Sequence, residues 1–320
     1  MEKHEDDDIE KRFRFQLKMM QVFLNFSRPW DIFDLQMKKI GFIDCYIDEW
    51  HANNYPAMIR NSELAGEFEL ALAWEESAVA GKKPIDEWCR EHGVGRARSA
   101  EEVVDRCDCL VVLSPDNPER HEALADLPLR SGKPVYVDKP FAPTRKAAER
   151  LFRLARDHRT PLMTSSALRF APSLTGALKD TIGDESIVFA ATRGPGKFEL
   201  YAIHQLEMLV MALGTGARRV MQLGNDRSDL MAVDYGDGRR GTIALFPGYE
   251  FAVTLGYGRS GILTLDRLEG FFEAFIGEML RFFLTGHCPF PPEETLEVVT
   301  LLETGIRAFD AFDNWVDVAR

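Results

Sequence analysis

The stretch CLVVLSPDNPERHEALADLPLRSGKPVYVDKPFAPTRKAAERLFRLA, residues 109–155, decides the fold. It opens on the largely apolar run 109–115, which is typical of a strand buried on both faces of a parallel sheet. A helical segment (119–132), a second strand (133–140) and a strongly amphipathic helix (144–159) follow. Strands that alternate with helices at this spacing predict right-handed βαβ units.

The same alternation extends outward from this stretch in both directions. On its N-terminal side, MKKIGFID (37–44) is a short basic run that leads into a strand, and the following segment 49–61 predicts a helix interrupted by Pro56. On its C-terminal side, PLMTSS (161–166) supplies a further strand. We therefore expect an α/β fold in which residues 37–167 form a Rossmann-like domain with a doubly wound parallel sheet.

The rhythm changes after residue 167, where short strands come in close succession. The turn Tyr235-Gly-Asp-Gly238 predicts a hairpin, because glycine adopts the positive φ angles that such turns need. A helix is expected near 201–213, and two more near 267–286 and 293–312. Residues 168–320 therefore predict an α+β domain with an open, mainly antiparallel sheet.

Residues 1–36 do not resemble the rest of the chain. An acidic head leads into an aromatic-rich segment, and a clean domain start appears only at Met37. Our hypothesis is that Met37 is the natural initiator and that residues 1–36 are an N-terminal extension from an upstream start or an appendage.

Composition excludes several classes of partner. The formal net charge of −12 repels phosphate backbones, so nucleic acid is not expected. No apolar run approaches the roughly 18 residues that span a bilayer, so no membrane is expected. Five cysteines without zinc-type spacing are typical of reduced thiols in a cytoplasm. We therefore expect a cytoplasmic globular protein.

A ligand site is expected at one edge of the parallel sheet. In open sheets of this kind, ligands bind at the carboxyl ends of the strands where the strand order reverses. Three segments reach that edge, namely 44–51, 114–117 and 138–141. The second domain is expected to close over them.

The chain resembles the glucose–fructose oxidoreductase/inositol dehydrogenase (Gfo/Idh/MocA) family in order over about residues 37–315. Residues 114–155 resemble the family stretch that runs from the fourth strand into a Glu-Lys-Pro motif, which here is Asp138-Lys139-Pro140. SSALRFAPS (165–173) resembles the segment that leads into the family's substrate domain.

Two later segments carry the same resemblance. GPGKFELYAIHQLEMLVMALG (194–214) resembles the helix with the family's active-site histidine, which corresponds to His204. GHCPFPPEETLEVVTLLETGIRAF (286–309) resembles the last family helix, which packs back on the first domain.

The resemblance implies an NAD(P)-dependent oxidoreductase that transfers hydride to or from a sugar, a polyol or a derivative. Lys139 would position the nicotinamide and the substrate, and His204 would be the general acid/base. The family has an aspartate four residues before this histidine, but here that position is Leu200. Tyr201 is the expected local substitute as a hydrogen-bonding partner.

The cofactor loop departs from the family. The three glycine positions that let a pyrophosphate approach a helix N-terminus are Asp44, Tyr46 and Glu49. One carboxylate about 5 Å from a phosphate costs roughly 3 kcal/mol at an effective dielectric near 20. Glu75, near the end of the strand expected in GEFELALAWEE (66–76), is placed for a ribose hydroxyl and slightly favours NAD over NADP. The residues expected at the cofactor are Asp44, Tyr46, Glu75, Ser114, Pro115, Asn117, Asp138 and Lys139.

Substrate contacts are expected from four further residues: Trp50, His51, Arg169 and Glu207. Trp50 and His51 belong to a cluster of acids and aromatics at the cleft mouth that suits a polyol or a cation. Arg169 suits an anionic substituent or an interdomain salt bridge. Glu207 would orient His204 or hold a metal with it, but two ligands are too few for a metal site, and none is expected.

Two alternatives stay open beside the oxidoreductase. One is a non-catalytic sugar-binding or regulatory protein that has lost the cofactor. The other is a metal-assisted lyase or isomerase that uses the acidic cluster and His204. In each case the partner is a small carbohydrate-like molecule, and the alternating apolar pattern of residues 229–257 predicts a homo-oligomer through the C-terminal sheet.

Overall fold

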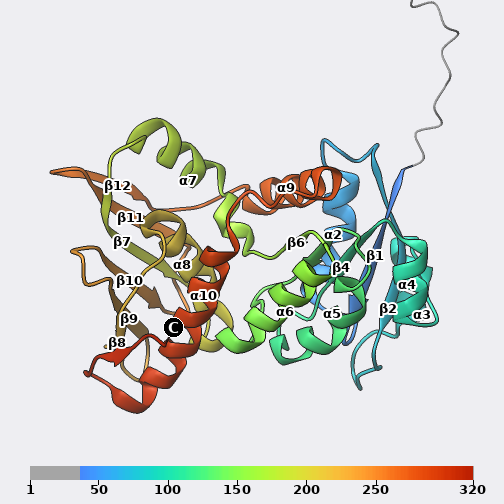
Figure 1. Ribbon diagram of the computed structural model, residues 1–320, viewed down its shortest axis with the longest axis horizontal. Coiled ribbons are helices and arrows are strands. Elements are labelled where there is room, and N and C mark those ends of the chain that lie inside the picture. The colour runs from blue at the N-terminus through green and yellow to red at the C-terminus, as the bar shows by residue number, and fades with distance from the viewer. Residues whose placement is uncertain (1–36, 320) are drawn as a thin grey trace, which may run out of the picture. The chain divides into compact units, whose positions relative to one another are not determined.

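The computed structural model describes residues 37–319, and the hypothesis about residues 1–36 lies outside them. The first layer is a six-stranded sheet in the order β3-β2-β1-β4-β5-β6, with every pairing parallel (Figure 1). This order is that of doubly wound dinucleotide-binding sheets, so the predicted Rossmann-like sheet is confirmed. The strands are β1 (Lys38–Asp44), β2 (Phe68–Glu75), β3 (Gly95–Arg96), β4 (Cys109–Val112), β5 (Val135–Val137) and β6 (Leu162–Met163).

Helices cover both faces of this sheet. One face packs against α2 (Trp50–Arg60), α3 (Ile85–His92) and, from late in the chain, α9 (Phe271–Thr285). The other face packs against α4 (Ala100–Arg106), α5 (His121–Leu129) and α6 (Arg145–Asp157). Burial on both faces explains the nearly continuous apolar runs of the central strands.

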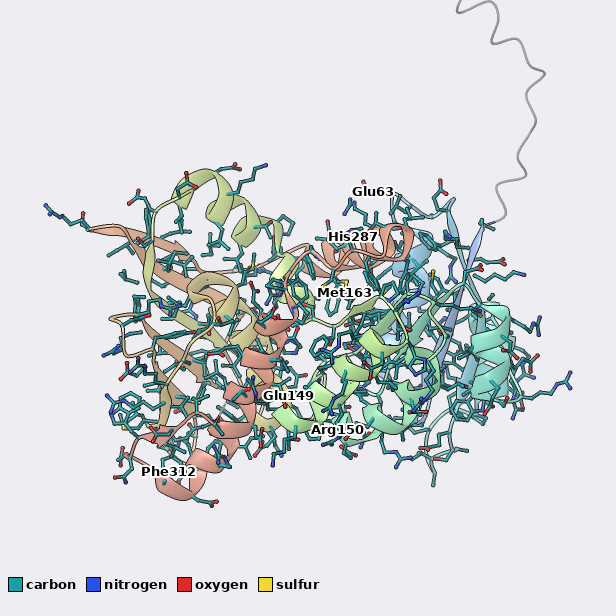
Figure 2. The ribbon with its side chains drawn as sticks, viewed as in Figure 1. Glu63, Glu149, Arg150, Met163, His287 and Phe312 are labelled. Atoms are coloured by element: carbon teal, nitrogen blue, oxygen red, sulfur yellow. The ribbon has the colours of Figure 1, made fainter. Side chains whose placement is uncertain are left out.

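Two of these helices show how packing acts on the local sequence pattern. Helix α2 runs through Pro56 without interruption, because the buried proline ring packs in the core and only one backbone hydrogen bond is lost. Helix α6 buries Ala148 and Leu151, whereas Glu149 and Arg150 lie on its outer side (Figure 2). The apolar face of this amphipathic helix therefore packs against the core.

The second sheet has seven strands in the order β12-β11-β7-β10-β9-β8-β13. All neighbours are antiparallel except β7 and β10, so the expected mainly antiparallel sheet is confirmed. Gly236 and Gly238 have φ angles of 76° and 104° in the predicted hairpin between β9 and β10. The strands are β7 (Ile187–Gly194), β8 (Arg219–Gln222), β9 (Asp229–Asp234), β10 (Arg240–Leu245), β11 (Ala252–Tyr257), β12 (Gly261–Leu265) and β13 (Val316–Asp317).

Helices α8 (Phe198–Leu213) and α10 (Pro292–Arg307) pack in succession behind this sheet. Helix α10 also contacts α6, where the Glu303 carboxylate accepts the backbone N–H of Arg145 at 2.8 Å. Short helices η2 (Ala167–Phe170), α7 (Pro172–Gly176) and η3 (Ala177–Ile182) lead from the first sheet to the second, and η1 (Pro118–Arg120) and η4 (Ala308–Ala311) are single turns. The two sheets therefore share helices along their junction.

His121 holds together the loops that come after β4 and β5. Its fully buried ring contacts the carbonyl oxygens of Leu113 at 2.9 Å and Phe141 at 3.0 Å. Ser114, in the first of these loops, has a φ of 86°, which is uncommon for a residue other than glycine. Such backbone conformations often occur at functional sites.

Candidate functional site

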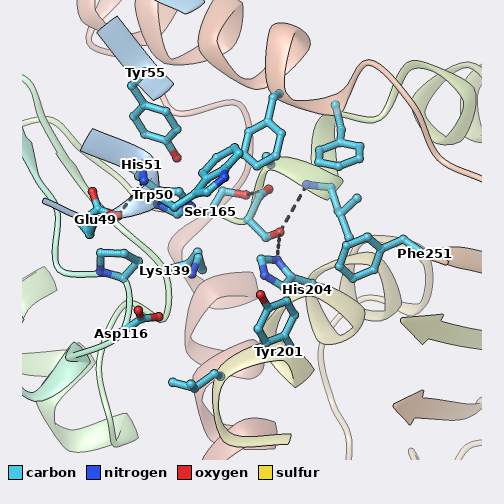
Figure 3. Close-up of a pocket in the computed structure, with 17 residues that line it drawn as sticks. Glu49, Trp50, His51, Tyr55, Asp116, Lys139, Ser165, Tyr201, His204 and Phe251 are labelled. Carbon is cyan, nitrogen blue, oxygen red and sulfur yellow. Dashed lines mark hydrogen bonds between the residues drawn. The ribbon is translucent and has the colours of Figure 1, made fainter. Parts of the chain in front are cut away.

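A cavity of about 320 Å³ lies at the carboxyl ends of the central parallel strands (Figure 3). Its volume is in the lower part of the range of about 300–1,000 Å³ that small-molecule sites occupy. Residues of α2 and of the loops after β1, β4, β5 and β6 meet residues of α8, α9 and the segment before β11 there. The lining residues are Glu49, Trp50, His51, Tyr55, Pro115, Asp116, Lys139, Ser165, Ser166, Ala167, Leu168, Leu200, Tyr201, His204, Phe251, Phe271 and Phe272.

Lys139 faces this cavity from the parallel sheet, and His204 faces it from the helix behind the second sheet. Lys139 comes after β5 and is only 8% exposed, while His204 lies on α8 and is partly buried. Burial, together with the charges of Lys139 and His51, lowers the pKa of His204 well below its ordinary 6.5. The imidazole is therefore neutral at physiological pH.

The hydrogen-bonding partner of His204 is Ser166. The Ser166 hydroxyl lies 2.7 Å from Nδ1 of the imidazole. Tyr201 was expected in that role, but its ring only meets the His204 ring edge-on, with centroids 5.5 Å apart. Tyr201 is 41% exposed at the cavity mouth, because it lies one turn before His204 on the side of α8 that faces outward. The sequence contained no signal for Ser166 beyond its position in the segment 165–173.

Arg169 and Glu207 were expected to contact substrate, with a salt bridge as the open alternative for Arg169, and the structure places both behind the cavity wall. The Arg169 guanidinium donates to Glu207 at 2.7 Å and to Glu294 at 2.6 Å, and it lies 4.2 Å from the Phe290 ring. Both partners of the Arg169–Glu207 pair are nearly fully buried. Arg169 therefore serves as a salt bridge between η2, α8 and α10, and Glu207 is engaged by Arg169 rather than by His204.

In the altered cofactor loop, the carboxyl groups of Glu49 and Asp44 accept hydrogen bonds from nearby backbone N–H groups. Glu49 caps α2, with its carboxylate accepting the backbone N–H of His51 at 2.6 Å and that of Ala52. These are the groups that offer an anion site at a helix N-terminus. Asp44 is fully buried and accepts the N–H of Cys45 at 2.7 Å. Burial and the neighbouring Glu49 raise the pKa of Asp44 well above 3.8, which disfavours a negative charge at this position.

The other residues expected at the cofactor are largely bonded to one another. Glu75 accepts the N–H of Ile47 at 3.0 Å, and Tyr46 lies under the ammonium of Lys82. Ser114 donates to the thiol of Cys45 at 3.0 Å, and that thiol in turn donates to Asn117 at 3.8 Å. Of the predicted cofactor residues, Pro115 and Lys139 line the cavity. The remainder surround it or lie in the adjoining loop.

Asp138 was expected to contact the cofactor, yet it is fully buried and bonded to Nδ1 of His51. The two residues lie 87 positions apart, so no local pattern links them. His51 lines the cavity, as does Trp50, which packs on Phe272 with ring centroids 4.7 Å apart. Phe251, Phe271 and Phe272 complete an aromatic wall that no sequence pattern had indicated.

Metal-binding clusters and membrane-spanning helices are both absent from the described part of the chain. Among residues 37–319, no group of three or more His, Cys, Asp or Glu side chains is placed to hold a metal ion. Within the same residues, no helix is long and apolar enough to cross a bilayer. All five cysteines are free thiols.

A doubly wound sheet with a small cavity at its carboxyl edge, covered by elements of a second sheet, is the architecture of Rossmann-type nucleotide-binding folds. Residues 39–166 match the model of the Gfo/Idh/MocA oxidoreductase family, described as having an NAD-binding Rossmann fold. The resemblance found in the sequence is thereby confirmed for these residues.

One relative and two solved structures illustrate the likeness. The dehydrogenase aclE of Aspergillus oryzae is 30% identical over 142 residues, which are 42% of this chain and only 37% of that protein's length. A probable dehydrogenase of Thermotoga maritima superposes with a TM-score of 0.71 at 15% identity, covering 88% of this chain and 98% of that one. The scyllo-inositol dehydrogenase of Lactobacillus casei, solved with NAD(H) and scyllo-inositol, gives 0.70 at 14% identity over 89% of this chain and 100% of that one. At such identities the solved structures establish the fold.

Proposed function

We propose that the chain oxidises or reduces a sugar, a polyol or a derivative, with NAD or NADP as hydride carrier. The observation that supports this most is the convergence of Lys139 and His204 from two domains on one cavity of about 320 Å³. An ammonium and an imidazole at one ligand are what a reacting hydroxyl or carbonyl oxygen needs.

The chain's own residues have distinct tasks in this proposal. The Lys139 ammonium polarises the reacting oxygen and stabilises negative charge on it. Neutral His204 offers a hydrogen bond to a neighbouring hydroxyl. Trp50 and Phe272 present apolar faces to the ring of the substrate, and Asp116 at the cavity wall accepts from its hydroxyls.

The fit of a dinucleotide differs between the two ends of its site. Lys139 and Pro115 leave room at the nicotinamide end, and the nicotinamide would supply the acceptor or donor of hydride. At the pyrophosphate end the residues present do not fit, since the Glu49 carboxylate occupies the N–H groups of α2. Binding in the manner of this fold therefore requires Glu49 to move aside. Glu75 keeps a slight preference for NAD in this proposal.

The position of Glu49 favours a second candidate function. A chain whose helix N-terminus is already capped by its own acid suits a sugar-binding protein that works without a cofactor. Lys139, His51 and His204 would then serve as binding groups only.

Calorimetric titration of NAD, NADH, NADP and NADPH into the full chain separates the two candidates. Micromolar binding of any of the four, together with turnover in a screen of inositols and aldoses, supports the oxidoreductase. If none of the four dinucleotides binds while a polyol from the same screen does, the result supports the second candidate and overturns the first.

Two wider properties belong to the same proposal. We place the protein in the cytoplasm, in keeping with its five free thiols. We also place a homo-oligomer contact on the second sheet, where Val188, Phe189 and Ile262 expose apolar side chains on β7 and β12.

A further inference from the structure

A buried carboxylate and an imidazole form a pair at the edge of the cavity. Oδ2 of Asp138 contacts Nδ1 of His51, while Oδ1 accepts the N–H of Lys139 at 2.8 Å and the hydroxyl of Tyr136 at 3.2 Å. Burial alone would raise the pKa of Asp138, but electrostatic attraction to His51 and Lys139 and the hydrogen bonds that these two residues donate bring it below 3.8. Asp138 is therefore an ionised group with its oxygens committed to donors.

The ring of His51 is held in one orientation. It stacks on the Tyr55 ring with centroids 4.9 Å apart and planes 10° apart, and its backbone N–H is bonded to Glu49. A carboxylate at Nδ1 requires a proton there, which leaves Nε2 of the neutral ring as an acceptor. Nε2 of His51 has no hydrogen-bond partner among the described residues, and the side chain lines the cavity.

His204 differs from His51 in each of these respects. Its Nδ1 meets the hydroxyl of Ser166 and not a carboxylate. Leu200, one turn earlier on α8, is an apolar residue that lines the same cavity. The adjacent ammonium of Lys139 opposes a second positive charge on His204. An imidazole in this setting is a poor proton acceptor.

We propose that His51, oriented by Asp138, is the group that exchanges a proton with the ligand, and that His204 only hydrogen-bonds to it. This inference rests on the proposed binding of a hydroxyl- or carbonyl-bearing ligand in the cavity. In the step, the O–H bond of the ligand breaks and its proton forms a new N–H bond at Nε2. The electron pair stays on the oxygen, which faces the Lys139 ammonium, and Asp138 stabilises the imidazolium. The reverse step returns the proton to oxygen.

The tautomer of His51 tests the pair without any need for turnover. Long-range proton–nitrogen NMR spectra of the full chain with 15N-labelled histidine report which ring nitrogen carries the proton. His51→Gln and His204→Gln assign the two signals, and His287→Gln, an exposed histidine on the loop after α9, is the matched control (Figure 2). We expect an Nδ1–H tautomer for His51, and for Asp138→Asn a shift toward Nε2–H, because the amide can donate to Nδ1. An Nε2–H tautomer in the unaltered chain overturns the proposal.

Turnover distinguishes the role of His51 from that of His204. With the cofactor and polyol pair that the calorimetric and activity screen selects, kcat should fall about 10²–10⁴-fold in His51→Gln and in Asp138→Asn. His204→Gln should mainly raise KM. A larger loss of kcat in His204→Gln than in His51→Gln contradicts the proposal. If no pair is turned over, the hydride chemistry fails, while the tautomer of His51 still decides whether the pair exists.

Discussion

The Glu49 carboxyl group accepts the backbone N–H of His51 at 2.6 Å, so the N-terminus of α2 is already capped by an acidic side chain of the chain itself. In dinucleotide-binding folds this helix end receives the pyrophosphate, because its N–H groups and dipole favour negative charge. The glycine-poor loop thus opposes cofactor binding mainly through the side chain of Glu49. Asp44, which the sequence suggested as a second charge, is buried, and its pKa is raised well above 3.8.

Replacing Glu49 by glycine should strengthen dinucleotide binding. The change removes the competing carboxylate and leaves a residue that helix N-caps tolerate. At pH 8, above the Glu49 pKa of about 7, we expect the affinity for NADH to rise at least about tenfold, since one carboxylate near a phosphate costs roughly 3 kcal/mol. Titration calorimetry measures it, with exposed Glu119→Gln as control. An affinity equal to that of the unaltered chain would show that Glu49 does not compete.

Glu49 should also make stability depend on pH. Burial, opposed by the His51 charge, raises its pKa from 4.5 to about 7. A raised pKa means that the stabilising contribution is complete below 4.5 and is lost as pH rises through 7. The difference corresponds to about 3 kcal/mol. Urea unfolding across this range should show the loss in the unaltered chain, and Glu49→Gln should lack it. Parallel curves for the two chains would contradict the assignment.

Lys139→Met should abolish most turnover if the proposed oxidoreductase function holds. The variant keeps the apolar stem and removes the charge that faces the reacting oxygen. We expect kcat to fall about 10²–10³-fold. Lys146→Met, an exposed lysine of α6, is the matched control. Circular dichroism checks that both variants fold, and a Lys139→Met enzyme with unchanged kcat would remove Lys139 from the reaction.

Arg169→Met should destabilise the protein without acting on the ligand. The change leaves Glu207 buried without its partner, which typically costs about 3–5 kcal/mol. Adding Glu207→Gln should recover part of this loss, because a neutral amide is easier to bury. Urea unfolding of the single and double variants measures both effects. A polyol affinity that falls while stability is kept would return Arg169 to the substrate site.

Ile262→Asp should weaken self-association. Ile262 on β12 is 74% exposed, and a charge there opposes apolar contact between two copies of the sheet. Sedimentation over a concentration series should show a shift toward monomer. Val79→Asp, an exposed valine outside the sheet, is the control. A chain that is monomeric before any substitution rejects the contact.

Local patterns were sufficient for much of the architecture. The apolar runs at 109–112 and 135–137 form strands of the parallel sheet, because a strand that is buried on both faces needs apolar side chains on both sides. The departure of residues 44–49 from the glycine pattern was also readable from the chain, although its consequence was not. The interruption predicted at Pro56 was wrong, because the core packing of one ring outweighs a local propensity.

By itself, the sequence determined the order of strands and helices, the carboxyl edge where a site would form, and the presence of Lys139 and His204 there. Hydrophobic periodicity and loop chemistry are properties of neighbouring residues, so they can be read along the chain. Only the tertiary structure decided that Asp138 binds His51, that Arg169 binds Glu207 and that Ser166 meets His204. Each of these pairs joins residues that are remote in sequence. Whether a hydrogen bond forms depends on differences of a few tenths of an ångström in the donor–acceptor distance, and no sequence pattern encodes them.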